Sequence, residues 1–297
     1  MSSKRVLYTG LAGNVLVAVT KAIAALMTRS SAMWAEAVHS AVDCGDQILL
    51  LYGLHRSKLP PDEAHPLGHG RELYFWSFIV ALMIFAVGAG ISIYEGVLHI
   101  RQPEPINNPL LNYIVLALSL VFQGWSSVVA FREVKKAKGS MGFIEGFQNS
   151  KNPPAYMVLF EDVADILGIV IAAIAVFGVT HFHVAALDGI ASILIGLILA
   201  TIAIGLARES KSLLIGEQAT LTLRRSIVHI AKDVSDVQEV EVVLAVQLSP
   251  EQVVAALKVR FPDALRAPQL AEQIKRIEHA IQQRHPEVIA LYVRPRD

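Results

Sequence analysis

Two stretches of this sequence place ionisable side chains inside long apolar runs. His39 and Asp43 are four residues apart, so on a helix their side chains leave the same face one turn apart and can bind one small cation. The second stretch supplies three carboxylates, Glu161, Asp162 and Asp165. Ionisable groups at membrane depth are costly unless they are paired, hydrated or bound to a cation. One imidazole with several carboxylates and no thiolate favours Zn²⁺, Mn²⁺, Fe²⁺ or Co²⁺ over Cu⁺.

A third group of possible ligands lies in a segment rich in Pro and Gly. Asp62, His65 and His69 fall within eight residues of one another. Two imidazoles and a carboxylate at this spacing can bind a metal, and they can equally well hydrate a surface loop. Spacing alone leaves both interpretations open.

The elements that must position these residues are predicted to be membrane helices. Six apolar stretches, each close to the ~20 residues needed to cross a bilayer, run over about 6–28, 32–54, 73–98, 109–131, 155–180 and 184–207. Of the charged residues, 28 lie in 1–208 and 24 in the much shorter 209–297. We therefore expect a six-helix, all-α transmembrane domain over 1–208 and a water-soluble domain over 209–297.

Composition also limits the partners. The net charge of +0 gives no electrostatic reason to expect nucleic acid binding. With one cysteine, Cys44, the chain can form no internal disulfide. The expected surroundings are a lipid membrane, and no resident cofactor is expected.

Basic residues in the connecting loops predict the orientation. Ten lysines and arginines flank one side of the predicted helices: Lys4, Arg5, Arg56, Lys58, Arg71, Arg132, Lys135, Lys136, Lys138 and Lys151. The other side has only Arg29 and Arg101. Because basic loops resist translocation, both termini are predicted to be cytoplasmic. The expected location is the inner membrane of a bacterial cell.

The last part of the chain has a different pattern. A helical stretch near 218–233 is followed by β-rich runs at 237–248 and 252–260, a helix at 268–284 and a strand at 288–294. This α-β-β-α-β order predicts a small ferredoxin-like α+β domain. Its size suits dimerisation or sensing better than an elaborate enzyme core.

Several motifs resemble the cation diffusion facilitator family. They are GNVL at 13–16 with Lys21, AEAVHSAVD at 35–43, HPLGHGR at 65–71, LDG at 187–189 and RES at 208–210. The motifs cover nearly the whole chain. A Glu-Asp pair at 161 and 162 after Asn152-Pro153-Pro154 resembles the branch of this family that contains the ninth human zinc transporter.

The resemblance implies a homodimeric exporter of divalent cations that is driven by inward proton movement. It implies a tetrahedral metal site between the second and fifth helices and a cytosolic ferredoxin-like domain. Position by position, His39 and Asp43 match the family's ligands on the second helix, and Asp162 matches the second ligand on the fifth.

Two departures from the family pattern affect the expected sites. Val158 stands where the family usually has a histidine, so we expect Glu161 to supply the missing ligand, with Asp165 in reserve. The soluble domain lacks the histidines that metal-sensing relatives carry on strands and at the extreme C-terminus. His229, His279 and His285 remain, on predicted helices or their ends, and we expect dimerisation without a regulatory metal site.

The predicted function is a metal/proton antiporter that exports Zn²⁺, with Mn²⁺, Fe²⁺ and Co²⁺ also compatible, by alternating access. Asp62, His65 and His69 are expected to bind a second metal. One alternative is a membrane sensor or scaffold that binds metal without transport. Another is a metal-dependent membrane enzyme, but neither an H-E-x-x-H motif nor repeated H-x-x-x-H sets occur in the sequence.

Overall fold

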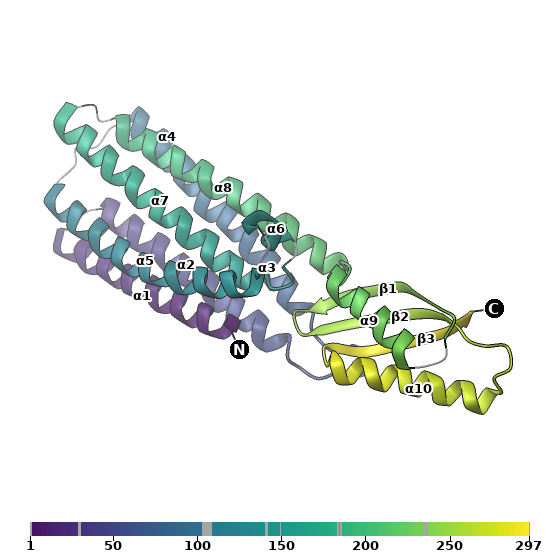
Figure 1. Ribbon diagram of the computed structural model, residues 1–297. Coiled ribbons are helices and arrows are strands. Elements are labelled where there is room, and N and C mark those ends of the chain that lie inside the picture. Colours follow the sequence, from purple (N-terminus) through teal and green to yellow (C-terminus); the bar gives the residue numbers. More distant parts are fainter. Residues whose placement is uncertain are drawn as a thin grey trace. The chain divides into compact units, whose positions relative to one another are not determined.

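The computed structural model describes residues 2–28, 31–102, 109–139, 142–148, 150–182, 184, 186–234 and 237–296 (Figure 1). Arg29, used above to predict orientation, lies outside these residues. The chain divides into two compact units. The membrane unit comprises Met1–Lys58 and Glu72–Lys211, and the C-terminal unit comprises Leu59–Arg71 and Ser212–Asp297.

Long helices build the membrane unit. They are α1 (Ser2–Thr28), α2 (Ser31–Arg56), α3 (Glu72–Met83), the π-helix η1 (Ile84–Ala89), α4 (Gly90–Arg101), α5 (Pro109–Lys138), the short α6 (Phe143–Gln148), α7 (Pro153–Phe182) and α8 (Ala186–Ile215). α3, η1 and α4 follow one another without a break. α5 and α7 begin at prolines, which the first helical turn tolerates because its N–H groups lack intrahelical partners.

Five of these helical segments are long and apolar enough to cross a membrane. Within the described residues they are Lys4–Ala24, Glu72–Arg101, Leu110–Lys136, Pro153–Phe182 and Ala186–Ile215. The remaining long helix, α2, is less apolar because His39, Asp43, Asp46 and Gln47 interrupt it. The expected membrane body of several helices followed by a small α+β region is thereby confirmed.

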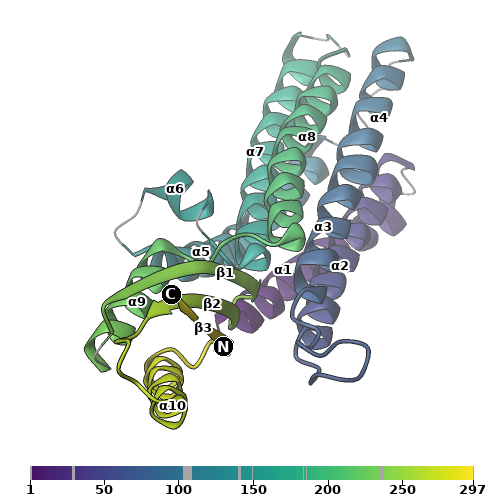
Figure 2. The same ribbon diagram turned by 90° about the vertical axis from the view of Figure 1, so that its right-hand side faces the viewer.

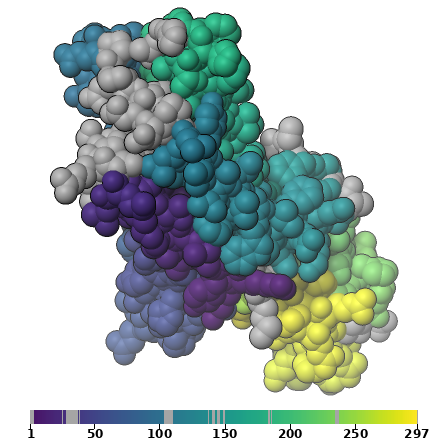
Figure 3. All heavy atoms as spheres, turned by 90° about the vertical axis from the view of Figure 1, so that its left-hand side faces the viewer, coloured from purple at the N-terminus to yellow at the C-terminus, as the bar shows by residue number. Residues whose placement is uncertain are grey.

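Apolar side chains cover much of the outside of the membrane unit. Figure 3 shows α1 and α5 side by side on one face, and the two helices pack against each other. Val19 and Ile23 of α1 and Val121 of α5 are each more than half exposed. Such a surface is unfavourable in water and is suited to lipid chains.

Tight packing inside the membrane unit brings α1, α2 and α7 together. A Cβ atom on Gly10 of α1 would lie 3.0 Å from Cγ1 of Val158 and 3.2 Å from Oε1 of Gln47. Val158 is fully buried, together with Leu50 of α2. The absence of a side chain at Gly10 therefore allows α1 to approach the helices that carry the candidate ligands.

The C-terminal unit is a three-stranded α+β fold. Its elements are α9 (Leu221–Val234), β1 (Glu239–Ser249), β2 (Gln252–Arg260), α10 (Ala267–Arg284) and β3 (Val288–Arg296). The strand order is β1-β2-β3, with β1 antiparallel and β3 parallel to β2. The two helices contact each other and share one apolar core with the sheet (Figure 2). Alternate residues of β2 are buried, as the sequence pattern predicted.

The segment that joins α2 to α3 belongs to the C-terminal unit. A Cβ atom on Gly70 would lie 3.1 Å from the carbonyl oxygen of Leu248 and 3.1 Å from Cβ of Ser249, and it would overlap Gln252. Gly216, with φ of +121°, lies close to the guanidinium of Arg71. The loop therefore packs directly against the β1-β2 hairpin.

Candidate metal sites

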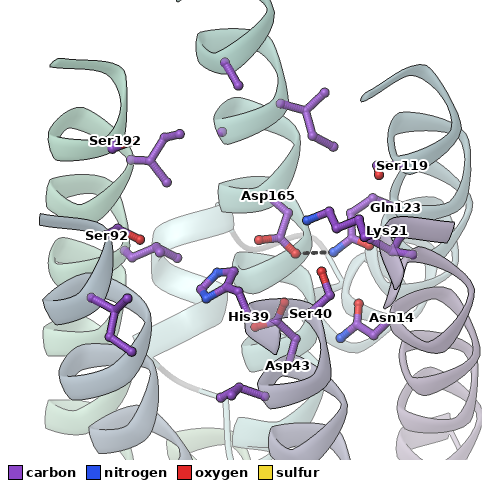
Figure 4. Close-up of a pocket in the computed structure, with 18 of the residues that line it drawn as sticks. Asn14, Lys21, His39, Ser40, Asp43, Ser92, Ser119, Gln123, Asp165 and Ser192 are labelled. Carbon is purple, nitrogen blue, oxygen red and sulfur yellow. Dashed lines mark hydrogen bonds between the residues drawn. The ribbon is translucent and has the colours of Figure 1, made fainter. Parts of the chain in front are cut away.

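A cavity of about 360 Å³ lies among the helices of the membrane unit (Figure 4). At ~30 Å³ per water molecule, it has room for about ten waters, enough for a hydrated cation. Its walls come from α1, α2, η1, α4, α5, α7 and α8. The polar and charged side chains on these walls are Asn14, Lys21, His39, Ser40, Asp43, Ser92, Glu95, Ser119, Gln123, Asp165 and Ser192.

Three expected ligands share this cavity. His39 and Asp43 enter it from one face of α2, as their spacing predicted, and Asp165 enters it from α7. Gln123 of α5 donates a hydrogen bond from Nε2 to Oδ2 of Asp165, which orients the carboxylate (Figure 4). The structure thus brings a histidine and two aspartates from two helices to one space.

The other two acidic residues of α7 lie outside the lining of the cavity. Glu161 is buried and accepts a 2.8 Å hydrogen bond at Oε2 from Nε2 of Gln47. Asp162 is 0% exposed, and neither of its carboxylate oxygens has a hydrogen-bond partner among the described residues. Asp46 of α2 is also buried, and its Oδ1 has no such partner. All three carboxylates are thus buried outside the lining of the cavity.

Position along the helix axes explains this division. The cavity takes its α7 residues from Asp165 onward, and its last α2 residue is Asp43. Glu161 and Asp162 precede Asp165 by about one turn, and Asp46 follows Asp43 by about one turn. Glu161 lies on the same side of α7 as Asp165, one turn earlier.

The expected set of His39, Asp43, Glu161 and Asp162 is not assembled into a compact site. Within the described part of the chain, no three of their ligand atoms lie within 4.8 Å of one another. A tetrahedral zinc site has bonds near 2.0–2.3 Å. Binding of one cation by this set therefore requires side chains or helices to move inward.

Two charged residues on the cavity wall were not expected as site residues. Lys21 had been noted only as part of a motif, and Glu95 was not singled out. Glu95 is the single Asp, Glu, Lys or Arg in the apolar stretch 73–98. Glu95 could have been predicted by the reasoning that identified Asp43: an ionisable group at membrane depth is costly, so its presence in an apolar stretch indicates a function.

The expected loop ligands are assembled. Ligand atoms of Asp62, His65 and His69, which we call the loop triad, all lie within 4.8 Å of one another. Oδ1 of Asp62 accepts a hydrogen bond from the backbone N–H of His65 at 2.6 Å and lies 3.1 Å from Nδ1 of the same residue. Oδ2 lies 3.0 Å from Nε2 of His69. Gly68 permits the turn between the histidines because its φ is +79°.

Hydrogen bonding also fixes the charge of Asp62. The backbone N–H of His65, followed by the side chain of His69, lowers the pKa of Asp62 to about 2. The carboxylate is therefore ionised at neutral pH. One carboxylate and two imidazoles provide three ligands of the kind that Zn²⁺ and similar cations bind.

The remaining histidines of the C-terminal unit do not gather. His229 and His279 are on exposed helix surfaces, and each interacts with a residue four positions away. His285 lies 2.7 Å from Oγ of Ser226 and 3.1 Å from Oε1 of Glu287, so it links α9 to the turn before β3. In the described part of this unit, the loop triad is the one compact group of three possible metal ligands.

Comparison with known families identifies the chain. The family described as "Cation efflux transmembrane domain" matches residues 7–215. The chain belongs to the cation efflux family. This family consists of cation transporters rather than enzymes, which confirms the resemblance drawn from the motifs.

Relatives within the cation efflux family are similar over part of the chain. The mitochondrial proton-coupled zinc antiporter SLC30A9 of Xenopus laevis is 36% identical over 199 residues, 66% of this chain and 35% of the relative. Its Homo sapiens counterpart is 38% identical over 172 residues, 57% of this chain and 30% of the relative. Metal tolerance protein C4 of Arabidopsis thaliana is 35% identical over 216 residues, 72% of this chain and 47% of the relative. The chain thus matches less than half of each relative's length.

Proposed function

We propose that this protein exports a divalent transition-metal cation, first Zn²⁺, in exchange for protons. The observation that carries the proposal is the cavity in the membrane unit, where His39, Asp43 and Asp165 meet. An imidazole and two carboxylates suit Zn²⁺ and are also compatible with Mn²⁺, Fe²⁺ and Co²⁺. The Xenopus and human relatives are named proton-coupled zinc antiporters, which supports the same cation and the same coupling.

The proposed mechanism is alternating access. Facing the cytoplasm, deprotonated His39, Asp43 and Asp165 bind the cation, with Glu161 one turn earlier on α7 as an additional carboxylate. Facing the opposite side, protons compete for the same lone pairs and release the cation. Proton coupling then follows from the ligands themselves. Asp162, which lies outside the cavity lining, is not among these ligands.

The remaining parts of the proposal concern the surroundings of the cavity. The basic loops support cytoplasmic termini. The proposed location is a bacterial inner membrane. The loop triad is proposed to bind a second metal. A second copy of the chain is proposed to associate through the C-terminal unit, where Val243, Leu244 and Tyr292 expose apolar surface. Light scattering of the purified protein tests this association, because a monomeric mass would contradict it.

Transport by purified protein in liposomes tests the function. With a pH difference across the membrane, Zn²⁺ flux reported by an enclosed dye should exceed that of empty liposomes and should fall when a protonophore removes the difference. Asp43→Ala should reduce the flux to background. Asp233→Ala, which removes an exposed carboxylate on α9, is the matched control and should transport normally. Unchanged flux in Asp43→Ala would contradict the site.

A metal sensor without transport remains the second candidate, because the loop triad is already assembled within the C-terminal unit. The same liposomes separate the two functions. A sensor should bind Zn²⁺ in calorimetry and show no flux at any pH difference.

A further inference from the structure

A lysine lies among the carboxylates of the cavity. Lys21 of α1 is the single lysine or arginine among the described residues that line it. Figure 4 shows its amino group directed toward Asp165, and the two charges interact. The position of this ammonium is not explained by cation binding alone, because a positive charge beside the ligands repels a metal ion.

The proximity of the opposite charges of Lys21 and Asp165 is favourable when no metal is bound. An isolated ammonium or carboxylate at membrane depth is costly, and each group offsets the cost of the other. A divalent cation needs the same carboxylate lone pairs. The ammonium and the metal therefore compete for Asp165, and Lys21 has a flexible four-carbon stem on which its ammonium can withdraw.

The formal charges of the cavity support this exchange. Asp43, Glu95 and Asp165 are the acidic residues on its walls, and Lys21 is the basic one. Counted over the lining residues in their ionised forms, three carboxylates and one ammonium leave two negative charges, which one divalent cation balances. Without Lys21 the same walls would hold an excess negative charge after the cation has bound.

We infer that Lys21 is a tethered cation that pairs with Asp165 in the metal-free cavity and gives up this carboxylate to the entering divalent cation. This inference rests on the proposed transport function. Competition by Lys21 weakens metal binding and assists release, because the ammonium returns to Asp165 as the cation leaves. Lys21 is thus a positioning residue that adjusts affinity and turnover, not a metal ligand.

Lys21→Met tests the inference, because it removes the charge and keeps a side chain of similar length. The dissociation constant for Zn²⁺, measured by calorimetry on the full chain in detergent, should fall about tenfold, within the range typical of coupled binding events. In liposomes, KM should fall and kcat should fall with it, because release becomes slower. Lys21→Arg keeps the charge and should retain the KM of the original protein.

Two further variants control this experiment. Lys4→Met changes a lysine on the same helix that does not line the cavity, and it should leave affinity and turnover unchanged. In an Asp165→Asn background the competition has no target, so adding Lys21→Met should change the Zn²⁺ affinity by much less than tenfold. This double variant also lacks the unpaired Asp165 carboxylate that could impair folding of Lys21→Met.

The outcomes distinguish this inference from the proposed function. Unchanged or weaker Zn²⁺ binding in Lys21→Met would overturn the role of Lys21, and so would an equal effect of Lys21→Met with and without Asp165. Absence of flux in the original protein would instead overturn the transport function. The calorimetric comparison would still report on Lys21 in that case.

Discussion

The helix cavity and the loop triad offer similar ligands in opposite arrangements. The cavity collects His39, Asp43 and Asp165 from helices separated by more than a hundred residues, around a space of about 360 Å³. The loop triad takes Asp62 and two histidines from eight consecutive residues and holds their ligand atoms within 4.8 Å. One arrangement depends on helix packing, and the other depends on a local turn.

This difference separates two requirements of metal binding. A site that only retains a cation benefits from preassembled ligands and a closed shell. A site that must also release its cation benefits from ligands on elements that can move relative to one another. The open cavity fits the second requirement, and the loop triad fits the first.

The largest expected effect tests which carboxylate of α7 serves the cavity. Asp165→Asn should reduce Zn²⁺ transport nearly to background, because losing one charged interaction of about 1.5–3 kcal/mol weakens binding roughly 10- to 100-fold. Asp162→Asn is the matched change on the neighbouring face of the same helix. Zn²⁺ affinity in this variant should stay within about threefold of the original.

Calorimetry and liposome flux measure both variants. If Asp162→Asn lost affinity and Asp165→Asn kept it, the ligand set would be His39, Asp43 and Asp162, and the cavity would not be the binding site. The metal would then bind beside the buried carboxylate of Asp162 and not in the open cavity.

An intermediate effect is expected at the loop triad. His69→Ala and Asp62→Asn should each weaken Zn²⁺ binding to the loop at least about tenfold. Measuring this in an Asp43→Ala background, where the helix cavity is disabled, isolates the loop. Glu63→Gln changes the neighbouring exposed carboxylate and should bind normally.

The pH dependence of the loop sharpens the same test. Because hydrogen bonds from His65 and His69 lower the pKa of Asp62 to about 2, its carboxylate stays ionised between pH 5 and 8. Its stabilising contribution is complete above the ordinary pKa of about 3.9 and is lost only as the pH falls through about 2. Asp62→Asn should therefore weaken binding by the same factor at pH 6 and pH 7.5. A factor that grows with pH over this interval would show that the carboxylate titrates there.

The smallest expected effect concerns the contact between the loop and the β1-β2 hairpin. Gly70→Ala adds a methyl group 3.1 Å from the carbonyl oxygen of Leu248 and 3.1 Å from Cβ of Ser249, so the loop or the hairpin must shift. We expect a cost of about 1 kcal/mol in unfolding free energy, near the low end for overpacking. Gly205→Ala meets no atom within 4 Å and serves as the control. Thermal unfolding of the full chain measures both, and equal midpoints would show that the contact does not hold the loop.

Sequence patterns predicted the parts of this protein that depend on local order. Long apolar stretches predicted the long helices, and the alternation of apolar and polar residues predicted the strands of the C-terminal unit. His39 and Asp43 follow from a four-residue spacing on one helix. The loop triad also follows from proximity in the chain, although spacing could not decide whether its side chains would gather.

Packing between elements far apart in the sequence determined which acidic residues line the cavity and where the loop is held. The position of the cavity along α7 depends on how the surrounding helices pack, which no spacing rule contains, so Glu161, Asp162 and Asp165 could not be ranked from the sequence. Glu95 was not singled out because it is the one charged residue in its apolar stretch, whereas the predicted ligands occur in clusters. The association of the loop with the β1-β2 hairpin arises from contacts between residues far apart in the sequence.

Inclusion of the loop in the C-terminal unit changes how the two units are tethered. The polypeptide passes between them after Lys58, after Arg71 and after Lys211. A domain attached by a single linker is released when that linker is cut, but three covalent connections keep these units joined after one cleavage. A protease that cuts only near Lys211 would leave the C-terminal unit noncovalently held through its own loop, which remains continuous with α2 and α3. After such a cut, the contacts between the loop and the β1-β2 hairpin would keep the C-terminal unit attached to the rest of the chain.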